Sequence, residues 1–104
     1  MSMQPIYDWI DAHAEECVGD LQRLVRQPSI SAQGVGLREC AELVREIMHD
    51  DELPADFHEL DEGPPVVFGH LKAKKPAKTI LCYSHYDVQP PEPLDEWSHG
   101  GPWS

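Results

Sequence analysis

One histidine and one aspartate, His85 and Asp87, carry the clearest chemical signal in the sequence, because they directly follow an apolar run. A neutral imidazole is a good zinc ligand, and a nearby carboxylate can fix which ring nitrogen faces the metal. The pair therefore predicts a metal-binding histidine with an aspartate that orients it. On these two residues alone the alternative stays open, because H-x-D occurs by chance and a histidine in a strand is often only packed or hydrogen-bonded.

The run from Thr79 to Tyr83 predicts the strand that positions this pair, since it is rich in β-branched, aliphatic and aromatic side chains. A continuous apolar run is typical of a strand that is covered on both faces. The prolines at 90, 91 and 93 then allow neither a helix nor a central strand. His85 and Asp87 are thus expected where a buried strand enters a loop, which is where open α/β sheets carry ligands.

Two helices are predicted upstream of the strands. The first begins at Pro5 and keeps apolar residues at helical spacing until Pro28, and the second covers residues 37 to about 50. The sequence SISAQGVG between them, residues 29 to 36, has the small and flexible residues of a loop. It lacks the glycine pattern and the lysine of a nucleotide-binding loop, so nucleotide binding is not indicated.

Two further strands are predicted, a weakly alternating one from Ala55 to about Leu60 and an apolar one from Val66 to Leu71. The short lysine-rich connection after Leu71 favours an antiparallel hairpin between the latter strand and the run at Thr79. The order of helix, helix, strand, strand, strand indicates the opening of an α/β domain. Three short strands give too little sheet for two long helices, so residues 1–104 are expected to be the front part of a larger domain.

The composition excludes several classes of protein. The 104 residues are 40% hydrophobic and 26% charged, which is typical of one small globular domain or a piece of one. An excess of 19 acidic over 8 basic residues gives a formal charge of -11, which disfavours nucleic acids and anionic lipid surfaces as partners. No signal peptide or membrane-spanning run is recognisable, and three widely spaced cysteines without a CxxC pair favour a reducing compartment. The cytoplasm is the expected location.

The stretch SHYDVQPPEP, residues 84 to 93, closely resembles the first metal-binding motif of the M20 family of zinc peptidases. The resemblance extends through LVRQPSIS, ECAELVREIM and VVFGHL, so it covers nearly the whole chain. The QPPEP version is most similar to the dipeptidase and carboxypeptidase branch of a family that also includes aminoacylases, desuccinylases and acetylornithine deacetylases.

The sequence departs from the family pattern at two places. Glu52 replaces a glycine that commonly caps the helix end, and WSHGGPWS replaces a W-x-x-P-P-F run.

This resemblance implies that His85 ligates one of two zinc ions and that the catalytic Asp87 orients its imidazole. Mn²⁺ or Co²⁺ are alternative metals. In the family, the aspartate that bridges both metals, a pair of glutamates and further ligands come later in the chain than this segment reaches. Completion of the site by Asp95, Glu96 or His99 is disfavoured, because a proline-rich loop would have to fold back.

The expected activity is zinc-dependent hydrolysis of dipeptides or related amide bonds by a longer enzyme, with a small peptide as substrate and residues 1–104 inactive alone. Two alternatives stay open, a deacylase of N-acyl amino acids in the same family and a non-catalytic interaction or metal-binding module. Members of the family often form homodimers through an inserted second domain, and no residue of that domain is present. The pocket that would select the substrate is also outside this segment.

Overall fold

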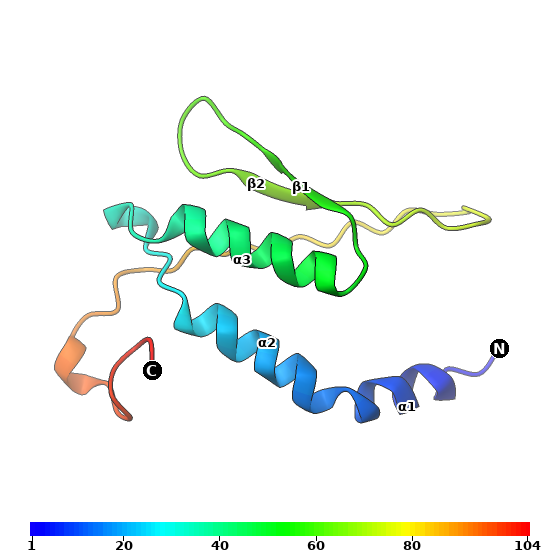
Figure 1. Ribbon diagram of the computed structural model, residues 1–104, viewed down its shortest axis with the longest axis horizontal. Helices are drawn as coiled ribbons and strands as arrows, with labels where there is room; N and C mark the ends of the chain where they lie inside the picture. Colours follow the sequence, from blue (N-terminus) through cyan, green and yellow to red (C-terminus); the bar gives the residue numbers. More distant parts are fainter.

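The computed structural model describes residues 1–104 as three helices and one β-hairpin (Figure 1). The helices are α1 (Gln4–Ala12), α2 (Ala14–Arg26) and α3 (Leu37–Asp50), and the strands are β1 (Ala55–His58) and β2 (Val66–Gly69). Two short 3₁₀ helices, η1 (Ser31–Gln33) and η2 (Leu94–Glu96), lie in the connecting segments. In Figure 1, α3 lies between the hairpin and α2. The predicted α/β class with an incomplete sheet is confirmed.

The single long helix predicted from Pro5 to Pro28 is divided into α1 and α2 at His13. The backbone of His13 leaves the helical conformation, with φ −112° and ψ 10°. Its ring Nδ1 lies 2.7 Å from the carbonyl oxygen of Trp9, and the two rings stack with centroids 4.0 Å apart. The histidine side chain thus bonds to the last turn of α1, which explains the interruption. No helix of the structure is both long enough and apolar enough to span a membrane.

The two strands form an antiparallel pair in which Ala55 lies opposite Gly69 and His58 lies opposite Val66. The strands predicted at these two places are confirmed, but the predicted hairpin between β2 and the run at 79–83 is wrong. Residues 79–83 form no strand, and the side chains of Ile80 and Leu81 are 87% and 82% exposed. The apolar run has no neighbouring strand among these residues with which to exchange backbone hydrogen bonds, so its β-propensity is not realised.

The helix α3 is the element that joins the parts of the structure. The guanidinium of Arg23 on α2 contacts Glu46 on α3 at 2.7 Å, and Arg38 of α3 contacts Glu59 just after β1 at 2.6 Å. These ion pairs are exposed to solvent, so each contributes little to the stability of the fold. Their main effect is to orient α3 between α2 and the hairpin.

Few residues of this chain are fully buried, and most of them lie around the first turns of α3. The hydrophobic ones are Ile30, Cys40, Ala41 and Ala55, to which Ser29 and Pro65 are added. They come from the loop before η1, the first turns of α3, the start of β1 and the residue preceding β2. Ala55 lies apart from the others at the end of α3, where its carbonyl oxygen is 2.7 Å from Nε2 of His49. We call the other five residues the buried cluster. It is the only region of the structure with the packing of a protein core.

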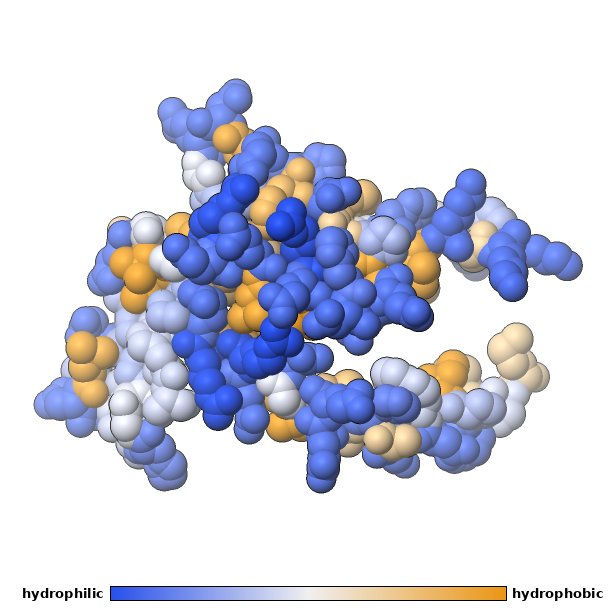
Figure 2. Space-filling view, viewed as in Figure 1, coloured by the Kyte–Doolittle hydropathy of each residue, from blue (hydrophilic) through white to orange (hydrophobic).

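Elsewhere, large apolar side chains reach the surface. Figure 2 shows apolar residues in orange and tan among the hydrophilic ones along α1 and α2, in the lower part of the view. On these two helices they are Ile6, Trp9, Ile10, Val18, Leu21 and Val25, each about half exposed. The amphipathic pattern of the sequence is therefore present, but its apolar side is largely left uncovered by residues 1–104.

The end of α3 has the left-handed cap that the sequence was expected to lack. Glu52 has φ 60°, its N–H donates to the carbonyl of His49 at 2.9 Å, and the N–H of Leu53 donates to the carbonyl of Met48 at 2.8 Å. These two bonds form a Schellman motif, which satisfies the last carbonyls of the helix. The cap exists with glutamate in place of glycine, so the backbone conformation of Glu52 is strained.

Replacing Glu52 by glycine is expected to raise the free energy of unfolding by about 1 kcal/mol, because glycine adopts this conformation without the clash of a Cβ atom. Urea denaturation, comparing Glu52→Gly with the original protein, measures the change. Glu52→Ala is the matched control, since it removes the carboxylate but keeps the Cβ. Equal stabilities of the glycine and alanine variants would contradict the strain.

Candidate metal site

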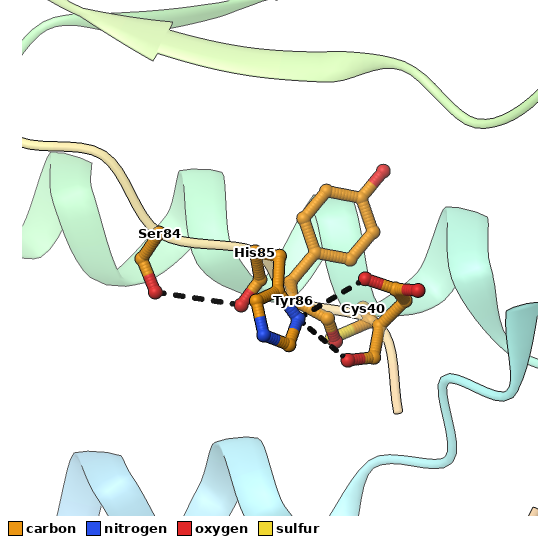
Figure 3. A network of polar contacts seen from close by, with 5 residues as sticks. Cys40, Ser84, His85 and Tyr86 are labelled. Carbon is orange, nitrogen blue, oxygen red and sulfur yellow. Dashed lines mark hydrogen bonds and ion pairs between the residues drawn. The ribbon is translucent and has the colours of Figure 1, made fainter. Parts of the chain in front are cut away.

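The imidazole of His85 and the carboxylate of Asp87 face each other, as the sequence predicts (Figure 3). His85 Nδ1 lies 3.1 Å from Asp87 Oδ1 and 2.9 Å from the main-chain oxygen of Asp87. Both partners are acceptors, so the proton of a neutral imidazole belongs on Nδ1, which donates to them. Nε2 is then left with a free lone pair.

The Nε2 side of the ring is open to approach. His85 is 73% exposed, and Nε2 has no hydrogen-bond partner in the structure. A histidine that donates one N–H to a carboxylate and presents its other nitrogen is the usual arrangement of a zinc-ligating imidazole. The pair thus fits a divalent metal as one ligand with its orienting carboxylate.

Asp87 remains ionised at neutral pH. Hydrogen bonding by the side chain of Ser31 lowers the pKa of its carboxyl, and the adjacent His85 lowers that pKa further. Desolvation acts in the opposite direction and raises the pKa; its effect is weaker than that of Ser31 but stronger than either contribution of His85. A charged carboxylate is the form that accepts the Nδ1 proton, so the environment of Asp87 supports its orienting role.

Tyr86, the residue between the pair, connects this segment to the buried cluster. Its hydroxyl donates to the carbonyl oxygen of Pro65 at 2.5 Å. Its own carbonyl oxygen lies 3.7 Å from the thiol of Cys40, which donates to it. Figure 3 shows the ring of Tyr86 on the side of the segment away from the imidazole of His85. Burial raises the pKa of the Cys40 thiol, so this group stays protonated and available as a donor.

The residue after Asp87 holds the other end of the segment. The N–H of Val88 donates to the carbonyl of Ser29 at 2.8 Å, and its carbonyl accepts from the N–H of Ser31 at 3.4 Å. These bonds form a parallel bridge between Val88 and Ile30. The predicted loop at 29–36 is therefore also the backbone partner of the site segment.

Sequence reasoning missed the roles of Cys40, Tyr86 and Pro65 around the site. Cys40 has only the helical spacing of an inward residue of α3, and Tyr86 occupies the unspecified position of H-x-D. No local pattern relates Tyr86 to Cys40 or to Pro65, because its hydrogen bonds to these two residues join segments that are far apart in the sequence. The spacing of these residues carries no signal that could have revealed the contacts.

The structure brings no further candidate metal ligand to the His85–Asp87 pair. No group of three or more histidine, cysteine, aspartate or glutamate side chains is arranged to hold a metal ion. Asp95 and Glu96 lie on η2, and His99 lies in the turn beyond it. The indole of Trp97 donates to the carbonyl of Pro91 at 2.8 Å, which keeps this terminal segment folded on itself. The residues present thus offer one imidazole with its carboxylate and no complete set of metal ligands.

The comparisons with known proteins agree with this geometry, although no family model matches the chain. The chain is 30% identical over 110 residues to Cys-Gly metallodipeptidase dug1 of Schizosaccharomyces pombe, and 26% identical over 113 residues to Cys-Gly metallodipeptidase DUG1 of Candida albicans. These matches cover 94% and 93% of the chain but only 23% of each relative. The chain thus spans about a quarter of their length.

A solved structure shows the same relationship. The crystal structure of Sso-CP2, an M20 family metallo-carboxypeptidase from Sulfolobus solfataricus, superimposes with a TM-score of 0.75 at 34% sequence identity. The match covers 83% of this chain and 19% of that protein. Similarity of sequence and of fold leads to one conclusion: the chain is homologous to a part of these metallopeptidases, one of which is an M20 family metallo-carboxypeptidase.

Proposed function

We propose that this segment belongs to a zinc-dependent dipeptidase, for which His85 supplies a metal ligand and Asp87 holds the imidazole in its ligating orientation. The observation that carries the proposal is the pair of contacts from His85 Nδ1 to Asp87, which leaves Nε2 free. The names of the two yeast relatives support a Cys-Gly dipeptide as the first substrate to test.

The residues present account for part of the chemistry. A divalent ion, when bound, supplies Lewis acidity that polarises a peptide carbonyl and lowers the pKa of water. Asp87 keeps the proton of the imidazole on Nδ1, so Nε2 is unprotonated and its lone pair can coordinate a metal ion. The other ligands and the general base are not among residues 1–104, so we expect this segment alone to be inactive.

The native polypeptide that carries this segment provides the direct test. Its purified form is assayed with Cys-Gly, other dipeptides and N-acyl amino acids, after removal of metal and again after addition of Zn²⁺, Mn²⁺ or Co²⁺. Metal-dependent release of amino acids from dipeptides is the expected result. Preference for N-acyl amino acids would identify a deacylase instead, and metal binding without any turnover would identify a non-catalytic module.

The isolated residues 1–104 provide a second test. We expect no hydrolysis with zinc or manganese, because one imidazole and its carboxylate cannot hold two metal ions and activate water. Turnover by this fragment would overturn the proposal that the remaining ligands lie elsewhere.

For the cell, we propose a cytoplasmic location, which agrees with the absence of any disulfide among Cys17, Cys40 and Cys82.

Replacing Asp87 by asparagine is expected to lower metal affinity or kcat/KM of the native polypeptide by about 10- to 100-fold. The asparagine keeps the shape of the side chain but removes the charge that fixes the Nδ1 proton of His85. Asp95→Asn is the matched control, since Asp95 is an exposed residue of η2 and is expected to leave both values unchanged. An equal loss in the two variants would show that Asp87 has no special role.

A further inference from the structure

Tyr86 is bonded to two other parts of the protein through two different atoms, since its hydroxyl donates to Pro65 and its carbonyl oxygen accepts from Cys40. We propose that Tyr86 is a positioning residue, which sets the geometry of the His85–Asp87 pair through its hydrogen bonds to Pro65 and Cys40. The inference rests on the proposed function and adds to it a residue that determines how well the metal ligand is oriented.

The first argument is the lack of other support on the N-terminal side. From residue 71 to residue 85, no backbone group bonds to another element, and the side chains of Ile80, Leu81 and Tyr83 are more than four-fifths exposed. Tyr86 is thus the first residue after β2 and its connection at which the chain is attached again. The position of His85, one residue earlier, depends directly on that attachment.

The second argument is the quality of the attachment. Pro65 and Cys40 both belong to the buried cluster, so the phenol and the carbonyl of Tyr86 bond to groups that do not move freely. The 2.5 Å hydroxyl contact also satisfies the carbonyl of Pro65, a residue that is itself buried. The two bonds are made by different atoms of Tyr86, the side-chain hydroxyl oxygen and the main-chain carbonyl oxygen. Together they limit both rotation and displacement of the segment.

The third argument is the geometry of the pair itself. In an extended segment successive side chains point to opposite sides, so fixing the ring of Tyr86 on one side directs His85 and Asp87 to the other. Both acceptors of the His85 Nδ1 proton, at 2.9 and 3.1 Å, belong to Asp87. A shift of the backbone at residue 86 would alter the two distances together. The bridge of Val88 to Ile30 holds only the far end of the segment.

The test compares Tyr86→Phe with Tyr83→Phe in the native polypeptide. Both remove one phenolic hydroxyl, but that of Tyr83 makes no hydrogen bond and its side chain is 86% exposed. We expect Tyr86→Phe to weaken Zn²⁺ binding about 5- to 10-fold by titration calorimetry, with KM for a dipeptide at saturating metal unchanged. Tyr83→Phe is expected to leave both values as they are.

A purely structural role for Tyr86 would change the unfolding midpoint without changing the metal affinity of the folded protein, and that result would overturn the proposal. Amide hydrogen exchange gives a second readout that needs no metal: Tyr86→Phe should speed exchange of the Val88 N–H about 5- to 10-fold, with the N–H groups of α2 unaffected. Unchanged exchange would also overturn it. If the unsubstituted protein binds no zinc, the proposed function fails, while faster exchange in Tyr86→Phe would still show that Tyr86 positions the pair.

Discussion

Replacing His85 by alanine in the native polypeptide is expected to lower kcat/KM for dipeptides by about 1,000-fold, because a metal centre that loses a ligand loses several kcal/mol of transition-state stabilisation. The imidazole is the ligand that we propose for these residues, and no nearby side chain is placed to substitute for it. Enzyme kinetics with added Zn²⁺, combined with metal analysis of the purified variant, measures the effect.

A second histidine substitution separates this effect from a general loss of histidine. His70 is exposed, lies just after β2 and makes no side-chain hydrogen bond, so His70→Ala should retain the activity of the unsubstituted protein. If His85→Ala kept its bound metal and lost less than about tenfold in kcat/KM, His85 would not be a metal ligand. The side chain of His85 is largely exposed, so we expect His85→Ala to fold normally. A loss of activity can then be assigned to the loss of the imidazole.

Replacing Gly36 by alanine is expected to cause the largest loss of stability, roughly 3 to 5 kcal/mol. Gly36 precedes α3 with φ 70°, and a Cβ atom there would lie 1.9 Å from the carbonyl oxygen and 2.7 Å from the carbonyl carbon of Pro28. These are backbone atoms, so no side-chain rotation relieves the overlap. The start of α3 would have to move away from the loop that carries Ser29 and Ile30.

Gly34→Ala is the matched control for this prediction. Gly34 has a similar φ of 64°, but nothing lies within 4 Å of an added Cβ atom. The control therefore carries only the backbone cost of about 1 to 2 kcal/mol. Chemical denaturation of both variants isolates the contribution of the contact with Pro28, and equal losses of stability would contradict it.

The parts of the fold that could be predicted from sequence are those set by local pattern. The helical spacing of α3 and the strand positions of β1 and β2 follow from the periodicity of their apolar residues, and the structure confirms them. His85 and Asp87 also face each other as expected, since a separation of two residues brings their side chains to the same side of an extended segment.

The errors have physical causes that local pattern does not contain. The run at Thr79–Tyr83 has the composition of a buried strand, but a strand needs a partner and this run pairs with neither β1 nor β2. The break at His13 depends on a side-chain contact with Trp9, and the cap at Glu52 is formed despite an unfavourable residue. The contacts of Tyr86 depend on tertiary packing alone.

The bridge between Ile30 and Val88 has a consequence for the order in which this protein acquires its structure. It closes a loop that contains all of α3 and the β1–β2 hairpin, so it is a contact between distant parts of the chain. Such contacts form late, because the entropy of closing a long loop must be overcome before they add stability. During synthesis the helices can form while the chain is still emerging, whereas the segment that carries His85 and Asp87 takes its position only after Val88 has left the ribosome.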